Sequence, residues 1–307
     1  MMRFLVSRLA SALVVILGVS VLVFFLIHLV PGDPVEVMLG EGSQPADREA
    51  LRRALGLDLP VHVQLGHYLQ GLLQGDLGVS LHSRRPIGEI LLERIPATLE
   101  LALAGLVVAV LIALPLGIIA ALRKDTPWDG GAMAFAMLGV SIPNFWMGPL
   151  LILVFSLWLG WLPVSGREGP ASLVLPALTL GTAMAAILSR MIRATLLEVL
   201  NEDYIRTARA KGLSWGQVVR RHALRNAMLP VITLLGLQLG ALLAGAVITE
   251  IVFSWPGIGQ LVIESIQRRD YPVVQACVLL ISLAYVLVNT LTDLCYAWLD
   301  PRIRLGQ

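Results

Sequence analysis

Charged side chains are scarce in this chain. Only 14% of its 307 residues are Asp, Glu, Lys or Arg, while 57% are hydrophobic, and the mean hydropathy is +0.79. Such a composition excludes an ordinary soluble domain, because too few polar groups remain to cover its surface. The net charge of +2 carries less information, since its distribution along the chain matters more than its sum.

Cysteine is also rare. Cys277 lies in the last apolar run and Cys295 near the end of that run, too far apart for a pair of metal ligands. Neither a disulfide framework nor a metal site follows from them. We interpret both as packing residues.

Motifs for nucleotide, metal and nucleophile chemistry are missing as well. The sequence has no G-x-x-x-x-G-K-[ST] loop to hold phosphate groups, no H-E-x-x-H and no G-x-S-x-G. The histidines are scattered, and only His62 and His67 are near each other, at a spacing that suits a shared metal poorly. We therefore expect no metal site, no cofactor bound by this chain, no nucleic-acid partner and no enzyme acting alone.

Long apolar runs are what the chain has instead. Six stretches lack Asp, Glu, Lys and Arg over the length of about 20 residues that a hydrocarbon core requires. They are Leu9–Gly32, Leu101–Leu122, Gly130–Gly166, Gly169–Ser189, Asn226–Thr249 and Tyr271–Thr292. The first is too long for the apolar part of a signal peptide, so we expect an uncleaved span. The sequence predicts an all-α membrane protein with six transmembrane helices.

The distribution of Lys and Arg predicts the orientation, because basic residues in short loops stay on the cytoplasmic side. With both ends inside, the inner segments hold Arg3, Arg8, Arg123, Lys124, Arg190, Arg193, Arg206, Arg209, Lys211, Arg220, Arg221, Arg225, Arg302 and Arg304. The short outer loops hold only Arg167, Arg268 and Arg269. The other six lie in the long first loop, which crosses largely regardless of charge. We expect both termini in the cytoplasm.

The long first loop, residues 31–98, is predicted to form a small folded cap outside the membrane. PADREALRRALGL and VHVQLGHYLQGLL have the pattern of short amphipathic helices with glycines near their ends. PIGEILLERIP predicts an interfacial helix that leads into the second span. Loops of this length are usually functional or folded.

The most informative stretch runs from Asn201 to Ile232, between the fourth and fifth apolar runs, and it is strongly basic. Good helix formers end at Gly212, the residue type that adopts the left-handed turn after a helix. Ser214 then precedes Gln217 in the capping-box spacing that begins another helix. Two short helices with a break between them are predicted. On spacing alone, a solvated cytoplasmic loop is the alternative.

Polar and helix-bending residues inside the spans are few. Four prolines are predicted to bend their helices: Pro115, Pro143, Pro149 and Pro176. Gly236 and Gly240 share a helix face that allows close packing. Uncharged polar residues could line a watery path if they face inward, namely Asn144, Thr182, Gln238 and Asn289.

TARAKG followed by HALRNAMLP resembles the cytoplasmic loop of ABC importer permeases, in the branch that carries dipeptides, oligopeptides, nickel or glutathione. LVPGDP, LGLDLP and FSWPGIGQLVIESIQRRDYPVVQ resemble the same branch. The family's loop carries a Glu-Ala-Ala motif, where this chain has Arg206-Thr207-Ala208, and Gly212 falls on the family's glycine. His222-Ala223-Leu224-Arg225 replaces the family's Ile-x-Leu-Pro, with the proline displaced to Pro230. The family's glutamate salt bridge is therefore not expected at position 206.

The resemblance implies a type I importer permease: a first helix with an extracytoplasmic helical loop over 1–98, a five-helix core over 99–299 and a cytoplasmic tail over 300–307. The coupling loop, at about 194–228, would dock on an ATPase subunit. The residues implied in that docking are Tyr204, Arg206, Thr207, Ala208, Arg209, Ala210, Lys211, Gly212, His222, Arg225 and Asn226.

The implied protein is the pore subunit of a binding-protein-dependent importer in the bacterial inner membrane. Its implied partners are a second homologous permease, two ATPase subunits that bind ATP and Mg, and an extracytoplasmic solute-binding protein. Two other classes stay open from the residues themselves: an ion-coupled secondary transporter and an intramembrane protease. An ion-coupled secondary transporter would need coupling charges, which the six apolar runs lack. An intramembrane protease would need a nucleophile–base pair, and none is evident in the sequence. The ligand is not determined.

Overall fold

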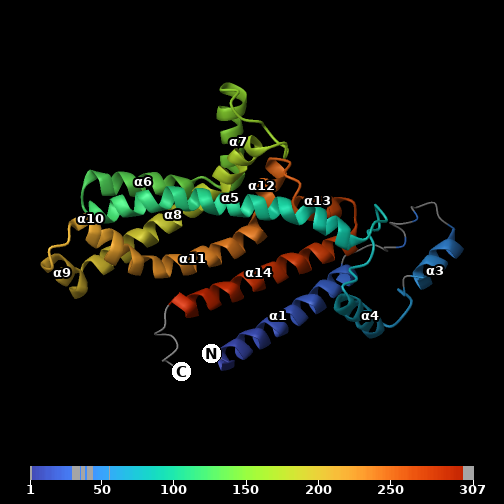
Figure 1. Ribbon diagram of the computed structural model, residues 1–307. Helices are drawn as coiled ribbons and strands as arrows, with labels where there is room; N and C mark the ends of the chain where they lie inside the picture. Colours follow the sequence, from blue (N-terminus) through green and yellow to red (C-terminus); the bar gives the residue numbers. More distant parts are fainter. Residues whose placement is uncertain (1, 30–34, 36–38, 40–43, 55, 300–307) are drawn as a thin grey trace. The chain divides into compact units, whose positions relative to one another are not determined.

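The computed structural model describes residues 2–29, 35, 39, 44–54 and 56–299. The predicted tail at 300–307 and most of the LVPGDP segment lie outside these residues. The described chain is helical, with one isolated bridge between Val79 and Pro86 and no strand (Figure 1). The elements are α1 (Met2–Leu29), α3 (Pro45–Ala54), α4 (Val61–Gln74), α5 (Ile87–Leu122), α6 (Pro127–Ser141), α7 (Asn144–Leu151), η1 (Ile152–Trp158), α8 (Pro170–Leu200), α9 (Asp203–Ala210), α10 (Trp215–Val218), η2 (Val219–Ala223), α11 (Leu224–Gly245), α12 (Val247–Val252), α13 (Ile258–Gln267) and α14 (Tyr271–Leu299).

Four helices in the described residues are long and apolar enough to cross a membrane. They are Ile87–Leu122, Pro170–Leu200, Trp215–Gly240 and Tyr271–Thr292. A fifth results if Pro127–Ser141 and Asn144–Trp158 form one broken span. The apolar part of α1, Ala10–Phe25, is shorter than the others. The structure thus supports four or five of the six predicted spans, and the crossing by α1 stays a prediction.

The helix predicted to lead into the second span is continuous with that span in α5. Residues 87–122 form one helix of 36 residues that continues through Pro96. No glycine stands between Gly88 and Gly105 to end the first part. A proline costs one backbone hydrogen bond, which neighbouring groups in a membrane protein can satisfy. The apolar run marks the membrane-embedded part of this helix and not its beginning.

The third predicted span is broken in the middle. α6 ends at Ser141, α7 begins at Asn144, and the two helices meet at 100°. Pro143 forces this break, because the residue before a proline is displaced from helical geometry: Ile142 has φ −98° and ψ 116°. Pro143 therefore separates two helices, which corrects the prediction that it bends a single helix. α7 turns sharply away from α6 (Figure 1).

The chain divides into two compact units. Unit 1 comprises Met1–Thr98 and Pro256–Val286, and unit 2 comprises Leu99–Trp255 and Leu287–Gln307. In unit 1 the predicted helices of the outer loop are present as α3 and α4, and Gly75 ends α4 in the left-handed conformation at φ 77°.

Unit 1 contains a buried apolar cluster in which Ile87, Leu91, Ile258 and Cys277 take part. Beside it, α4 packs against α1, where the rings of Phe24 and Tyr68 lie 5.6 Å apart. Burial raises the pKa of the Tyr68 hydroxyl to about 12, so this group stays neutral.

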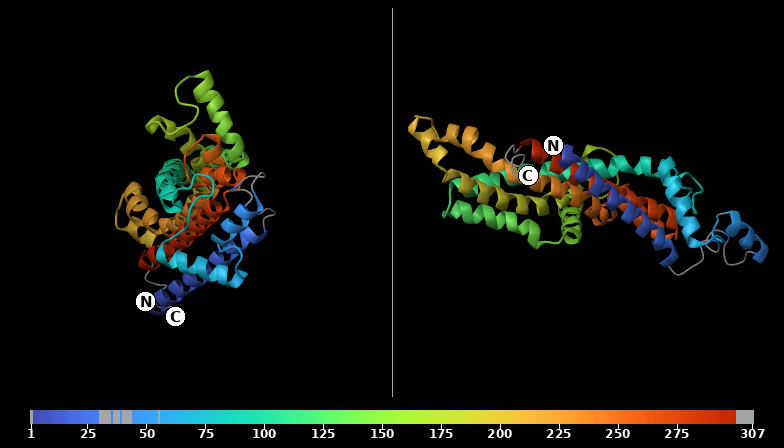
Figure 2. Two further views of the ribbon diagram at one scale, coloured as in Figure 1. Left: turned by 90° about the vertical axis from the view of Figure 1, so that its right-hand side faces the viewer. Right: turned by 90° about the horizontal axis from the view of Figure 1, so that it is seen from below.

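Unit 2 is built around α8, which packs against α6 and α11 (Figures 1 and 2). The backbones approach closely where glycine leaves room. A Cβ on Gly139 of α6 would lie 2.4 Å from the carbonyl oxygen of Thr182 on α8. On α11, a Cβ on Gly236 would lie 2.1 Å from Oγ1 of Thr292, which agrees with the close packing predicted for this face.

Candidate functional site

The basic loop contains a short, well-defined helix. α9 covers Asp203–Ala210, with Asp203 in its first turn and Arg209 in its last, the charge order that the helix dipole favours. Gly212 follows with φ 82°, in the left-handed region that favours glycine. The structure confirms the helix and the break predicted from the sequence.

One face of α9 is anchored in unit 2. Ile205 and Ala208 are 1% and 6% exposed and belong to a buried cluster that includes Leu196 from the last turns of α8. Their spacing of three residues places them on one helix face. The rest of this segment is turned to solvent. Its exposed residues are Tyr204, Arg206, Thr207, Arg209 and Ala210 of α9, and Lys211 and Gly212 directly after it.

The helix after the break begins with the predicted capping box, in which the backbone N–H of Ser214 donates to Oε1 of Gln217 over 3.2 Å. It is not the short helix that was predicted. α10 continues through the π-helical turn η2 into α11, and Trp215–Gly240 is one candidate span. No glycine or proline occurs from 217 to 229 to end it.

Three side-chain contacts hold the loop in shape. Nδ2 of Asn226 donates to the Tyr204 hydroxyl over 2.8 Å, which joins α11 to α9. The Arg209 guanidinium lies 5.2 Å from the Trp215 ring centroid. Arg206 and Asp203 form an ion pair at 3.2 Å, but both side chains are largely exposed, so it adds little stability. Of the other predicted loop residues, Arg225 is exposed and His222 half-buried.

A cavity of about 370 Å³ lies in unit 2 at the break between α6 and α7. Two of the four predicted path residues, Asn144 and Gln238, line it together. The other lining residues are Gly139, Val140, Ile142, Pro143, Leu180, Ala183, Met184, Ile187 and Leu242. None of the lining residues is charged.

The other two predicted path residues do not line this cavity. The Thr182 hydroxyl donates weakly to the carbonyl of Thr179, at 3.4 Å. Oδ1 of Asn289 is buried without a hydrogen-bond partner in the described part of the chain. The sequence identified the polar residues in the spans, but which of them share a cavity depends on the break at Pro143.

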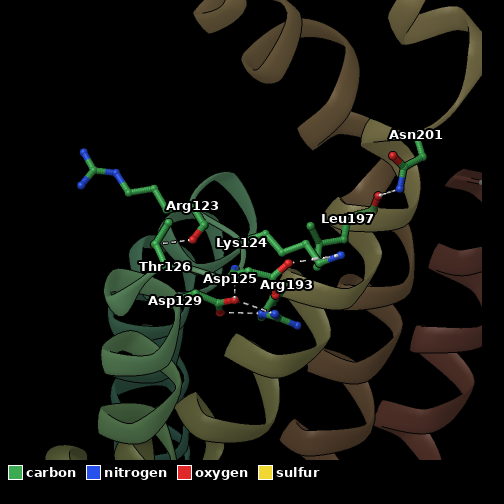
Figure 3. A network of polar contacts seen from close by, with 8 residues as sticks. All are labelled: Arg123, Lys124, Asp125, Thr126, Asp129, Arg193, Leu197 and Asn201. Atoms are coloured by element: carbon green, nitrogen blue, oxygen red, sulfur yellow. Dashed lines mark hydrogen bonds and ion pairs between the residues drawn. The ribbon is translucent and has the colours of Figure 1, made fainter.

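An ion pair between α6 and α8 was missed (Figure 3). Arg193 donates from Nε to Oδ1 of Asp129 over 2.7 Å and from Nη2 to Oδ2 over 2.6 Å. The backbone N–H of Asp125 adds a third hydrogen bond to Oδ2, at 3.1 Å. The Asp129 side chain is only 8% exposed. The available signal was an acid at the edge of an apolar run, where a lone charge needs a partner.

A second polar contact joins two loops of unit 1. Asp270 is 3% exposed and accepts hydrogen bonds from the Ser80 hydroxyl and from the backbone N–H groups of Leu81, at 3.1 Å, and His82, at 3.3 Å. Arg84 and Arg269 next to this contact both have φ 55°. A single buried carboxylate thus joins the segment before α5 to the segment before α14.

In the part of the chain that the structure describes, no three His, Cys, Asp or Glu residues cluster as metal ligands would. Comparison with protein families finds two matches. Residues 113–305 match the family described as binding-protein-dependent transport system inner membrane component, and residues 1–102 match its N-terminal component. The chain belongs to this family.

The permease has full-length relatives. It is 45% identical over 304 residues to the glutathione transport system permease protein GsiC of Escherichia coli O6:H1 (strain CFT073), with 99% of each chain covered. It is 43% identical over 336 residues to the dipeptide transport system permease protein DppB of Escherichia coli (strain K12), again with 99% of each covered.

Solved structures share the fold of the permease. A chain of the inward-facing MetNI methionine ABC transporter matches with a TM-score of 0.57 at 20% identity, covering 69% of this permease and 96% of that chain. A chain from the crystal structure of an amino acid ABC transporter with histidines matches with a TM-score of 0.56 at 15% identity, covering 69% and 94%. At these identities the likeness concerns the fold alone.

Proposed function

We propose that this permease is the pore subunit of an ATP-driven importer of small peptides, with a dipeptide or glutathione as the ligand. The ligand class is supported by the full-length similarity to permeases named for glutathione and dipeptide transport. The partners are a second homologous permease, two ATPase subunits that hold ATP and Mg, and an extracytoplasmic solute-binding protein. The permease contributes the path and the coupling segment, and the partners contribute hydrolysis and ligand capture.

The observation that carries this proposal is the construction of α9. One face is anchored through Ile205 and Ala208 to the end of a candidate membrane span, and the other presents cations and Tyr204 to solvent. A helix anchored in this way can transmit a movement of an ATPase subunit to α8. The docking surface consists of Tyr204, Arg206, Thr207, Arg209, Ala210, Lys211 and Gly212, with His222, Arg225 and Asn226 at its edge. Arg206 replaces the family's glutamate, so the ATPase contact at that position is of opposite sign.

The translocation path passes the cavity lined by Asn144 and Gln238. An uncharged cavity of this kind cannot pair the two charged termini of a peptide, and leaving a charge unpaired away from water is heavily penalised. The permease is therefore a permissive conduit that relies on its binding protein for selection. Thr182 and Asn289 belong to the path only if the helices rearrange during transport.

The orientation follows from charge. Fourteen basic residues in the inner segments, against three in the short outer loops, support an orientation in the bacterial inner membrane with both termini and α9 on the cytoplasmic side. The contact at Asp270 then lies outside, on the side that receives the binding protein. The pair Asp129–Arg193 lies on the cytoplasmic side, close to the coupling segment.

Purification of the tagged permease from its native membrane tests the assembly. The expected result is co-purification of two ATPase subunits and a second permease, with ATPase subunits lost when α9 carries Arg206→Glu and Arg209→Glu. Arg221→Gln, another exposed cation of the same loop, serves as the control. A permease that purifies without ATPase subunits and is active with an ion gradient alone would be an ion-coupled secondary transporter.

A further inference from the structure

The Asp129–Arg193 pair joins α6 to α8 close to the point where α8 contacts α9. Leu196, one turn after Arg193, belongs to the same buried cluster as Ile205 and Ala208 of α9. A displacement of α9 therefore acts directly on the last turns of α8. The ion pair crosses from α8 to α6 close to this junction (Figure 3).

The far end of the same helix pair borders the cavity. Gly139 lies ten residues after Asp129, about 15 Å along α6. It packs on Thr182, which precedes Arg193 by eleven residues on α8. The two contacts are therefore the ends of one antiparallel interface. Gly139, Val140 and Ile142 line the cavity just beyond it.

The Gly139–Thr182 contact and the Asp129–Arg193 pair restrict the movement of α6 along α8 to different degrees. A glycine packed on a backbone resists closer approach, but it tolerates sliding of one helix along the other. A bidentate arginine–carboxylate pair fixes both the distance between the two side chains and their relative direction. The N–H of Asp125 also ties the carboxylate to the turn before α6, which holds the Asp129 side chain in place for Arg193. Separating a largely buried pair leaves an uncompensated charge, which is strongly unfavourable.

We propose that Asp129 and Arg193 are positioning residues that make α6 and α8 move together, so that a displacement of α9 reaches the cavity at the break between α6 and α7. The inference rests on the proposed function, because it assigns a route for the force that the ATPase subunits supply through α9. Neither residue touches the ligand. Their loss should leave ATP hydrolysis running while less of it produces transport.

The test uses the whole complex, with both permeases and both ATPase subunits, in proteoliposomes with its binding protein. Asp129→Asn and Arg193→Gln each remove the ion pair. Arg193→Lys keeps the positive charge but loses the bidentate hydrogen bonding to the Asp129 carboxylate. For the first two we expect the ratio of ligand transported to ATP hydrolysed to fall at least fivefold, and for Arg193→Lys an intermediate loss. The double variant Asp129→Asn/Arg193→Gln should be no worse than either single variant, because all three lose the same interaction.

Two controls separate this role from a general loss of charge or packing. Arg190→Gln removes an exposed cation one turn from Arg193 on the same helix. Glu100→Gln breaks the ion pair of Glu100 with Arg167, elsewhere in unit 2. Both controls should keep the transport-to-hydrolysis ratio within twofold of the unaltered complex.

A second readout reports the cavity itself. In a background with Cys277→Ala and Cys295→Ala, Val140→Cys is placed on the lining of the cavity and labelled with a water-soluble thiol reagent. In the otherwise unaltered complex its labelling rate should change at least fivefold between the nucleotide-free and the vanadate-trapped state. Added Asp129→Asn should reduce this change below twofold although the ATPase subunits still hydrolyse ATP. If Asp129→Asn does not accumulate in the membrane, Arg193→Gln, which also removes the pair, gives the same comparison.

The possible failures are distinct. If the unaltered complex shows no ATP-dependent transport, the proposed function is wrong. If it transports, and the Asp129 and Arg193 variants keep both its transport-to-hydrolysis ratio and the nucleotide dependence of Val140→Cys labelling, the positioning role alone is overturned. Equal losses in the Arg190 or Glu100 controls would also overturn it.

Discussion

Single side chains decide how the loops of this permease are held. Asp270 accepts three hydrogen bonds from the 80–82 segment while almost fully buried. Gly212 allows the turn after α9, and a Cβ there would meet nothing within 4 Å, so only its backbone conformation demands glycine. The sequence predicted Gly212 from a local rule. It could not predict the role of Asp270, because its partners lie almost 190 residues away.

Replacing Asp270 by Asn should lower the free energy of unfolding by about 1–3 kcal/mol, because an amide NH₂ would face donors that now meet a carboxylate oxygen. Thermal unfolding of the purified protein in detergent measures the change. Glu49→Gln is the control, since its partner Arg53 and the carboxylate are both about two-thirds exposed, and it should change the stability by less than about 0.5 kcal/mol. Equal stability of Asp270→Asn and the unaltered protein would refute the role of this contact.

Gly212→Val should cost roughly 1–2 kcal/mol in the turn after α9, because a β-branched residue is disfavoured at φ 82°. We expect normal amounts in the membrane, weakened ATPase binding in pull-down assays and little transport. Gly216→Ala lies inside α10 with open space around it and should leave both properties intact. Undiminished transport by Gly212→Val at a normal protein level would count against the coupling role of α9.

At the scale of elements, the sequence predicted which segments are helical better than where they join. Apolar runs mark membrane burial, so they do not extend to the last turns of α8. They do not cover the polar beginning of α5 either, which was predicted from its own pattern as a helix leading into the span. They also hid the break at Pro143, since a proline in an apolar run is compatible with a bent helix or with two helices. The cavity depends on that break, and so the grouping of Asn144 with Gln238 was not predictable from local patterns.

The α6–α8 interface provides a test at this scale. Gly139→Ala should destabilise the protein by about 1–3 kcal/mol, because the added methyl group would lie 2.4 Å from the Thr182 carbonyl oxygen. Gly130→Ala on the same helix has nothing within 4 Å and should be neutral or slightly stabilising. The two variants are compared by thermal unfolding in one detergent. A Gly130→Ala loss as large as that of Gly139→Ala would mean that close packing is not the cause.

At the scale of the whole molecule, the proposed orientation puts α4 and α9 on opposite sides of the membrane. Leu73 of α4 is 90% exposed, and Ala210 ends α9. In a background with Cys277→Ala and Cys295→Ala, Leu73→Cys should react with an impermeant thiol reagent added to sealed cells, and Ala210→Cys should react only after lysis. The reverse pattern would contradict the orientation inferred from basic residues.

The central claim is that ATP and a binding protein drive transport from opposite faces of this permease. Its most direct test is uptake of labelled dipeptide and glutathione into proteoliposomes that contain the full complex, with ATP on the α9 side and the binding protein on the other. We expect uptake of at least one ligand that needs both additions and persists when ionophores collapse every ion gradient. Uptake that continues without ATP and stops with the ionophores would contradict it.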